Sequence, residues 1–510
     1  MKDYRVLKNS YYDSVTLMST TVTLKKELNL EELVMFMGTD MNKEMIKSVG
    51  LYNSSFDDAK PNDLMLAVVT ENDRSDWVDE VISKLTVKKT SSTDKQQSYK
   101  TLIQAKEAIH SNLCVISVPG VYAAHEAFKA LEYDMHVMLF SDNVSVSDEI
   151  ALKEYALSKN LLVMGPDCGT AIINGKGLCF ANQVRKGSIG LVAASGTGLQ
   201  EVTVIIDRFQ GGISQAIGVG GRDLSKDVGG LMMLKGIDVL DQDDETKIIV
   251  LISKPPHQSV LAKILTRLET VSKPVVLNLL DAHIEQLPKH VSFASTLSEA
   301  AKQALHLTGI DIGPMFEFDA SMLDKIKNEK SKYHQTQKFV KGLFCGGTLT
   351  AEALSVLRPH VDNIYSNVAK LDKEKMENPL KSDGHNLVDL GDDLFTQGKP
   401  HPMIEPTIRL DRIIHEAKLP ETKVILLDFE LGLGSHEDPV GVTLDTIKKA
   451  QEIAHQNQRH ITFVAYVCGT EKDIQGLRYS EERLKDLDVI VAKTNAQAAL
   501  IAANLLVGDK

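Results

Sequence analysis

Short apolar runs alternate with amphipathic stretches along most of this chain, and this alternation limits its possible folds more than any other feature. Runs of strand length include CVISVP at 114–119, IGLVAAS at 189–195, KIIVLIS at 247–253 and KVILLDFELG at 423–432. The segments that follow them have helical spacing of apolar residues. Repeated strand–helix–strand units build parallel sheets with helices on their faces. The sequence therefore predicts an α/β protein.

The chain is too long for one hydrophobic core, because 510 residues at ~150 per domain give roughly three to four domains. Two polar stretches, 87–100 and 325–338, contain almost nothing to bury and mark boundaries or surface linkers. We expect four units: a small α+β unit at 1–95, a reduced Rossmann-type unit at 96–186, and two related flavodoxin-like sheets at 187–335 and 336–510.

Charge and composition exclude several classes of partner. The 57 Lys and Arg against 69 Asp and Glu give a net charge of −12, and 5% of residues are aromatic, so we expect no nucleic acid partner. No apolar run approaches the ~20 residues of a membrane helix, and the N-terminus lacks a signal peptide's apolar core. The five cysteines lie far apart without CxxC spacing, which favours free thiols in a cytoplasmic protein.

Two glycine-rich turns connect a strand directly to a helix. The first is Ser195-Gly196-Thr197-Gly198 and the second is Gly346-Gly347-Thr348. The unpaired N–H groups and positive dipole end of a helix start favour an anion, so both turns are candidate phosphate sites. The alternative is an ordinary tight turn in which Ser195 or Thr197 caps the helix.

A third glycine-rich segment, AIGVGGRDLS, carries Arg222, whose guanidinium suits a phosphate or carboxylate. None of these segments fits G-x-x-x-x-G-K-[ST], and none is a convincing G-x-G-x-x-G opening a Rossmann unit. The sequence therefore supports neither a Walker-type ATP site nor an NAD site.

The segment 374–409 has little periodicity, and irregular segments longer than ~12–15 residues are usually functional or disordered. We interpret it as functional because it carries His401 between two prolines, Arg409, and the acidic VDLGDD cluster of Asp389, Asp392 and Asp393. The cluster could hold Mg²⁺ through its carboxylates, and a charged surface turn is the alternative. We assign no metal ligands.

Several motifs resemble known families. GPDCGTAIINGKG, KGSIGLVAASGTGLQEV and AIGVGGRDLS resemble the α subunit of succinyl-CoA synthetases, and FCGGTLTAEAL and YVCGTEKDIQG resemble the CoA-ligase domain of their β subunit. YYDSVTLM, MFMGTDMNK and DLGDD…FTQGKPHPMIEPTIR are similar to the FdrA family of acyl-CoA synthetase-like proteins over nearly the whole chain. The resemblance implies a CoA-binding-type domain at 96–186 and succinyl-CoA synthetase-like domains at 187–335 and 336–510.

The chain departs from the synthetases in three respects. It lacks their Gly-His-Ala-Gly phosphohistidine setting, their N-terminal Gly-rich CoA turn and an ATP-grasp domain. The FdrA resemblance implies instead a component of an oxamate carbamoyltransferase in anaerobic allantoin degradation, which converts oxalurate and phosphate to oxamate and carbamoyl phosphate. That transfer needs no CoA, and we expect companion carbamoyltransferase subunits and an oligomer.

The resemblance also places the Ser195–Gly198 and Gly346–Thr348 turns opposite each other across one phosphate. We hypothesise that Arg222 or Arg409 neutralises the oxalurate carboxylate and that His401 donates a proton to the leaving nitrogen. Two alternatives remain: an NDP-forming acyl-CoA synthetase that works with a separate ATP-grasp subunit, and a non-catalytic scaffold subunit.

Overall fold

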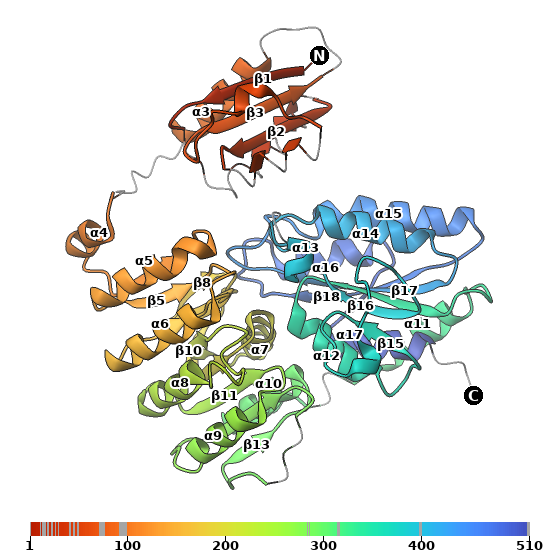
Figure 1. Cartoon of the computed structure of the whole chain (residues 1–510). Coiled ribbons are helices and arrows are strands. Elements are labelled where there is room, and N and C mark those ends of the chain that lie inside the picture. The colour runs from red at the N-terminus through yellow and green to blue at the C-terminus, as the bar shows by residue number, and fades with distance from the viewer. Residues whose placement is uncertain are drawn as a thin grey trace. The chain divides into compact units, whose positions relative to one another are not determined.

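The computed structural model divides the chain into two compact units, Met1–Tyr99 and Lys100–Lys510 (Figure 1). The structure describes residues 2–10, 12, 17, 20–21, 24–25, 27–28, 30–39, 42–43, 46–47, 50–70, 77–90, 99–282, 284, 286–313, 317–396 and 400–506. Within these residues, no helix is both long enough and apolar enough to cross a membrane.

The N-terminal unit is a three-stranded antiparallel sheet in the order β1-β3-β2, as expected for a small α+β unit. Its central strand, LMLAVV, is apolar throughout because both of its faces pack into hydrophobic clusters. The elements are β1 (Lys2–Leu7), β2 (Glu32–Met37), the short 3-10 helix η1 (Ser54–Phe56), β3 (Leu64–Val69) and α3 (Trp77–Thr90).

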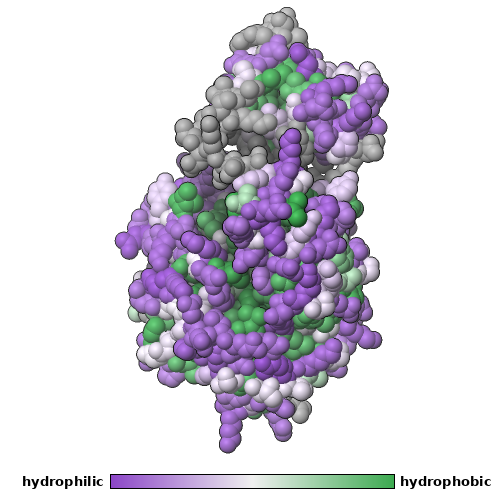
Figure 2. Space-filling view, turned by 90° about the vertical axis from the view of Figure 1, so that its left-hand side faces the viewer, coloured by the Kyte–Doolittle hydropathy of each residue, from purple (hydrophilic) through white to green (hydrophobic). Residues whose placement is uncertain are grey.

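The second unit begins with a three-stranded parallel sheet in the order β4-β5-β6, a reduced Rossmann-type arrangement. Exposed apolar side chains gather at its edge strand and the following helix, at Val115, Val118, Val121 and Tyr122. Figure 2 views the molecule from the side on which Figure 1 shows α5 and α6, and hydrophobic areas are visible there among hydrophilic ones. The elements are α4 (Leu102–Ile109), β4 (Leu113–Ile116), α5 (Gly120–Glu132), β5 (His136–Leu139), α6 (Val146–Ser158) and β6 (Val163–Met164).

A seven-stranded sheet follows, in the order β13-β12-β11-β9-β10-β7-β8. The hairpin β7–β8 pairs antiparallel with β10, so it belongs to this sheet although its residues fall within the range 96–186. The elements are β7 (Thr170–Ile173), β8 (Lys176–Cys179), β9 (Lys186–Ala193), α7 (Gly196–Arg208), β10 (Ile213–Gly218), α8 (Leu231–Gln242), β11 (Ile248–Ser253), α9 (Gln258–Leu268), β12 (Val275–Leu279), β13 (Val291–Phe293) and α10 (Leu297–Leu307).

The C-terminal region forms a six-stranded parallel sheet in the order β15-β16-β14-β17-β18-β19. Its elements are α11 (Ala320–Lys330), β14 (Phe339–Phe344), α12 (Gly347–Leu357), β15 (Ile364–Ser366), the 3-10 helix η2 (Asp372–Glu374), β16 (His385–Asp389), α13 (Asp393–Thr396), α14 (Thr407–Lys418), β17 (Thr422–Glu430), α15 (Gly441–Gln456), β18 (Thr462–Cys468), α16 (Leu477–Lys485), β19 (Ile490–Ala492) and α17 (Asn495–Leu506).

One element here differs from the expectation that 374–409 is irregular. Residues 385–389 form β16, an interior strand that pairs with both β14 and β15. Its apolar content is only Leu387 and Val388, both fully buried, so the run is too short to stand out in the sequence.

The seven-stranded sheet contains the flavodoxin strand order 2-1-3-4-5 with β9 as its first strand, and the six-stranded sheet contains it with β14 as its first strand and β15 as an additional edge strand, which confirms the predicted fold class. In this order, ligands bind beyond the carboxyl ends of the strands, where the direction of winding reverses next to strand 1. Helices α7 and α12 start at these two places and pack against each other in one hydrophobic core.

Hydrogen bonds tie the two large sheets together. The Arg208 guanidinium on α7 donates to the carbonyl oxygens of Val467, Gly469 and Lys493 in the C-terminal region. Gln200 Nε2 donates to the carbonyl oxygen of Leu431. These bonds join α7 to the strand ends of the C-terminal sheet.

Candidate functional site

The two glycine-rich turns are in direct contact. Ser195 caps α7 by accepting the Gly198 N–H at 2.9 Å, and its hydroxyl donates to Thr348 Oγ1 at 2.6 Å. A methyl group on Gly346 would lie 2.8 Å from Thr197 Cγ2, which is too close for a real side chain. The structure thus brings together residues of both predicted turns, and the glycine at 346 is needed for the approach.

The start of α7 has an unpaired hydroxyl beside it. Thr170 on β7 is 1% exposed, and its Oγ1 has no hydrogen-bond partner among the described residues. This oxygen lies 3.6 Å from the position that a Cβ on Gly196 would take. Buried hydroxyls are normally satisfied, so this donor stands out at the predicted turn.

The start of α12 has no side-chain cap, because its N-cap residue is Gly346. The carboxylate of Asp428, on β17, accepts the N–H groups of Cys345 and Gly346 instead. Arg409 donates to the Asp428 carbonyl oxygen and stacks over the Phe429 ring at 4.6 Å. Arg409 is only 1% exposed, and its Nη1 also donates to Sγ of Cys345, the residue before the turn, at 3.0 Å, so it supports the turn from its buried side.

Two charged groups flank Gly347. A methyl group there would overlap Asp389 Oδ2 and lie 3.1 Å from Lys254 Nζ. Burial raises the pKa of Asp389 to about 6, although the nearby Lys254 charge acts in the opposite direction. Asp389 was predicted only as a possible Mg²⁺ ligand, and Lys254 was not singled out. The sequence signal that could have indicated Lys254 is its position directly after a buried strand, at the end of the segment LISK.

His401 lies near the carboxyl end of β14. Its Nδ1 accepts the Met403 N–H at 3.2 Å, and its ring centroid is 5.9 Å from that of Phe180. Burial lowers the pKa of His401 to about 4, so the ring is neutral at neutral pH. With Nδ1 as an acceptor, the neutral ring carries its proton on Nε2, which lies beside Gly391.

Arg222 is already paired. Its side chain is 44% exposed, Nη2 lies 3.0 Å from Glu149 Oε2 and the same nitrogen donates to the Val144 carbonyl oxygen. It lies near the carboxyl of Asp167, whose pKa is raised to about 6 by desolvation and then by Asp142 and Asp393. Solvent nevertheless reaches Asp167.

The structure does not gather the acidic VDLGDD cluster into a metal site. Within the described residues, the one group of three possible ligand atoms lying within 4.8 Å of one another is Cys345, Asp428 and Glu430. Burial raises the pKa of Cys345 and of Glu430 well above their usual values, so both hold their protons. The Arg409 guanidinium, 3.4 Å from Asp428 Oδ1, already places a positive charge beside these donors.

Two buried carboxyls lie behind the helix starts. Glu201 on α7 and Glu352 on α12 each occupy the fifth position after their turn glycine, Gly196 and Gly347. Asn495 bonds to both, through its N–H to Glu201 and its Nδ2 to Glu352. Burial, followed by the Glu352 charge, raises the pKa of Glu201 to about 8, and burial raises that of Glu352 to about 7.

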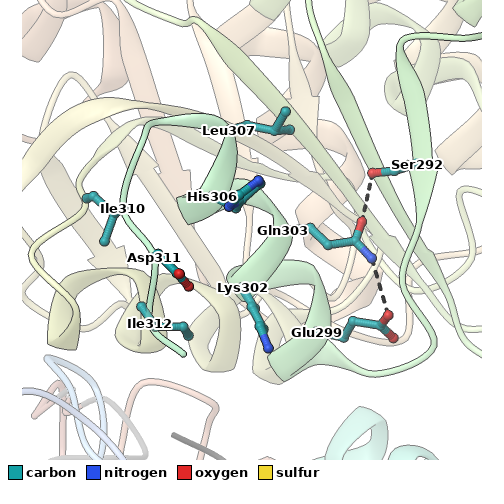
Figure 3. Close-up of a pocket in the computed structure, with 9 residues that line it drawn as sticks. All are labelled: Ser292, Glu299, Lys302, Gln303, His306, Leu307, Ile310, Asp311 and Ile312. Atoms are coloured by element: carbon teal, nitrogen blue, oxygen red, sulfur yellow. Dashed lines mark hydrogen bonds between the residues drawn. The ribbon is translucent and has the colours of Figure 1, made fainter. Parts of the chain in front are cut away.

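A separate surface pocket of about 490 Å³ lies along α10 (Figure 3). Gln303 links Ser292 and Glu299 on its wall, and Lys302 and His306 project from the same helix. None of the predicted site residues lines it.

Three family models match parts of the chain. A model described as AllF, heavy metal-associated domain, matches residues 1–101. A CoA binding domain model matches 184–278, which overlaps the range 96–186 that we expected to be CoA-binding-like only at 184–186. A CoA-ligase model matches 343–505.

A relative from Escherichia coli (strain K12), named Uncharacterized protein YahF, is 45% identical over 505 residues. The match spans 98% of this chain and 97% of the relative. The chain belongs to the same family as YahF. Together with the three domain models, this makes it an acyl-CoA synthetase-like protein of the AllF/FdrA type.

More distant relatives match in part. The succinate–CoA ligase [ADP-forming] subunit alpha of Aquifex aeolicus is 28% identical over 31% of this chain and 52% of that subunit, so the match spans about half of the relative. Two solved structures are similar at lower levels. ATP citrate lyase from Methanothrix soehngenii matches 42% of this chain and 39% of its own, with 21% identity and a TM-score of 0.32. Ca. Korarchaeum cryptofilum dinucleotide-forming acetyl-coenzyme A synthetase 1 matches 77% of this chain and 82% of its own, with 14% identity and a TM-score of 0.28.

The description "heavy metal-associated" raises the question of a metal in the N-terminal unit. Residues 1–101 contain neither cysteine nor histidine. This range therefore lacks the thiolate and imidazole ligands that most often bind soft and borderline metals, and its soft donors are methionine thioethers.

Proposed function

We propose that this protein is the phosphate-binding component of a carbamoyltransferase, which converts oxalurate and phosphate to oxamate and carbamoyl phosphate. The observation that carries this proposal is the contact between two helix starts, made by the Ser195–Thr348 hydrogen bond. Each helix start contributes about half a positive charge, so the pair favours a dianion such as phosphate. The AllF model over residues 1–101 supports the link to allantoin degradation.

In the proposed reaction, a phosphate oxygen attacks the ureido carbon of oxalurate. The carbon–nitrogen bond to the oxamate half breaks, a carbon–oxygen bond to phosphate forms, and the proton of monohydrogen phosphate ends on the leaving nitrogen. The turns Ser195–Gly198 and Gly346–Thr348 would hold the phosphate. Neutral His401 would hydrogen-bond to the leaving amide through Nε2, and Arg222, at the edge of the site, would attract the oxalurate carboxylate.

The direct test is phosphorolysis of oxalurate, measured as oxamate and carbamoyl phosphate formed, with and without the proteins encoded by neighbouring genes. The proposal expects product only when this chain is present and phosphate is supplied. If companion proteins form the same products without this chain, its proposed role is overturned.

A second candidate function is acyl-CoA synthesis with a separate ATP-grasp subunit. The CoA-ligase and CoA binding domain models favour it. Calorimetric titration with CoA separates the two candidates, because the carbamoyltransferase proposal expects no CoA binding and the synthetase expects saturable binding.

A further inference from the structure

Lys254 follows the strand that lies next to the first strand of the seven-stranded sheet. In the pairing of β11 with β9, Ile252 is opposite Ala193, so Lys254 and Ser195 extend equally far beyond the same edge. The Ala194 N–H donates to the Ile252 carbonyl oxygen at 3.0 Å, which holds the two chain segments together at this point. The lysine thus emerges beside the start of α7.

The side chain of Lys254 reaches the start of the other helix. Its Nζ is 3.1 Å from the position of a Cβ on Gly347, and the lysine is half-buried. Its charge acts on the carboxyls of Asp389 and Asp167. However, no described residue forms a hydrogen bond with Nζ, or an ion pair with it within 4.0 Å. Its ammonium is therefore available to a partner from solution, such as an anion beside the two helix starts.

The charges around Lys254 indicate what that partner is. Two helix starts contribute roughly one positive charge together, and the ammonium adds another. Asp389, with a pKa of about 6, is mostly ionised at neutral pH and offsets one of these charges, and Asp428 is paired with Arg409, so a positive excess remains. The unpaired hydroxyl of Thr170 adds a neutral donor on the α7 side. Such a set of donors fits a tetrahedral dianion with several acceptor oxygens.

We propose that Lys254 is a binding residue for the phosphate-like dianion held between the two helix starts, and that Thr170 is a second donor to it. This inference rests on the proposed function, and it adds the side chain that supplies a full positive charge. The residues named in the sequence analysis supply only backbone N–H groups and neutral hydroxyls at this point.

The test measures binding of inorganic phosphate to the full-length protein by calorimetry, for the unaltered protein and three variants. K254M removes the ammonium, and K254R keeps a charge with a different shape. K247M is the matched control, because Lys247 directly precedes β11 and lies at the opposite end of the same strand. Circular dichroism and thermal unfolding confirm that each variant is folded.

We expect K254M to weaken phosphate binding by about tenfold or more, since charge-assisted hydrogen bonds to an anion are among the strong ones. The phosphate affinity of K254R should lie between those of K254M and the unaltered protein, and K247M should bind phosphate as tightly as the unaltered protein. Equal binding by K254M and the unaltered protein would overturn the role of Lys254 and leave the proposed function standing. If the unaltered protein does not bind phosphate, the proposed phosphate site at the two helix starts is itself refuted.

A second measurement needs no variant. Phosphate should protect Lys254 from acetylation by an amine-reactive reagent, measured on its peptide by mass spectrometry, while Lys247 reacts equally with and without phosphate. Unchanged acetylation of Lys254 at saturating phosphate would count against the inference.

Discussion

Ser195 Oγ donates a hydrogen bond to Thr348 Oγ1 over 2.6 Å, although the two residues are 153 positions apart in the chain. Each belongs to the glycine-rich turn that starts a helix, one after the first strand of each large sheet. The bond therefore joins the two places at which ligands bind in sheets of this strand order.

A double-mutant cycle measures this bond. We expect S195A and T348V, each singly and together, to show a coupling of about 1 kcal/mol in the free energy of unfolding, the usual worth of such a hydrogen bond. Urea unfolding provides the measurement. T296A is the control, because Thr296 also caps a helix but its hydroxyl bonds only to Ser298 and Glu299 of that same helix, α10. The changes in the free energy of unfolding caused by T296A and T348V should add in the double variant. If the changes caused by S195A and T348V also add, the contact between Ser195 and Thr348 is contradicted.

Alanine substitutions at the two turns should differ in effect. G347A places a methyl group onto Asp389 Oδ2 and beside Lys254 Nζ, whereas G196A meets nothing closer than Thr170 Oγ1 at 3.6 Å. We expect G347A to weaken phosphate binding by about tenfold or more, since its methyl displaces charged groups at the anion. G196A should stay within about threefold of the unaltered protein. Equal losses in both variants, measured by calorimetry, would contradict this geometry.

Removing the unpaired hydroxyl of Thr170 should have opposite effects on stability and on binding. T170V keeps the shape of the side chain and removes a buried donor without a partner, so we expect unfolding to cost about 1 kcal/mol more. Phosphate binding should weaken several-fold. In the control T203V, the lost hydroxyl donates to the Gln200 carbonyl oxygen, so stability should fall while binding is unchanged. A T170V protein that is less stable and binds phosphate normally would show that the hydroxyl serves the fold.

The buried pair Glu201 and Glu352 predicts that the folded protein loses stability as pH rises from about 5 through neutrality. Both pKa values are raised in the folded protein, to about 8 and about 7, so the folded state holds these protons more tightly than the unfolded state. Their contribution is fully present below the unfolded pKa near 4.5 and is lost as pH rises through the folded values. E201Q should therefore flatten the decline in the free energy of unfolding between pH 5 and about 9.

Urea unfolding at several pH values checks this expectation. E245Q provides the control, because Glu245 pairs with Lys186 at the exposed surface. It should leave the slope with pH unchanged. If the free energy of unfolding of E201Q declines with pH as steeply as that of the unaltered protein, the pair Glu201 and Glu352 does not cause this decline.

The sequence predicted the fold class because β11, β17 and β18 contain clear apolar runs of strand length, each followed by a polar or glycine-containing turn. It did not predict β16, since Leu387 and Val388 are too few to form a visible run. It also did not predict Lys254, because that position gains its meaning only when β11 is known to lie beside β9. Arg409 was expected at the substrate, but its burial on Asp428 depends on how α14 packs against β17, which spacing alone does not reveal.

The bonds from Arg208 to three carbonyl oxygens of the C-terminal region have a further consequence. They join the end of α7 to β18 and to the segment after β19, so any separation of the two sheets would have to break all three bonds. We therefore expect the two large sheets to keep their relative position when a small anion binds.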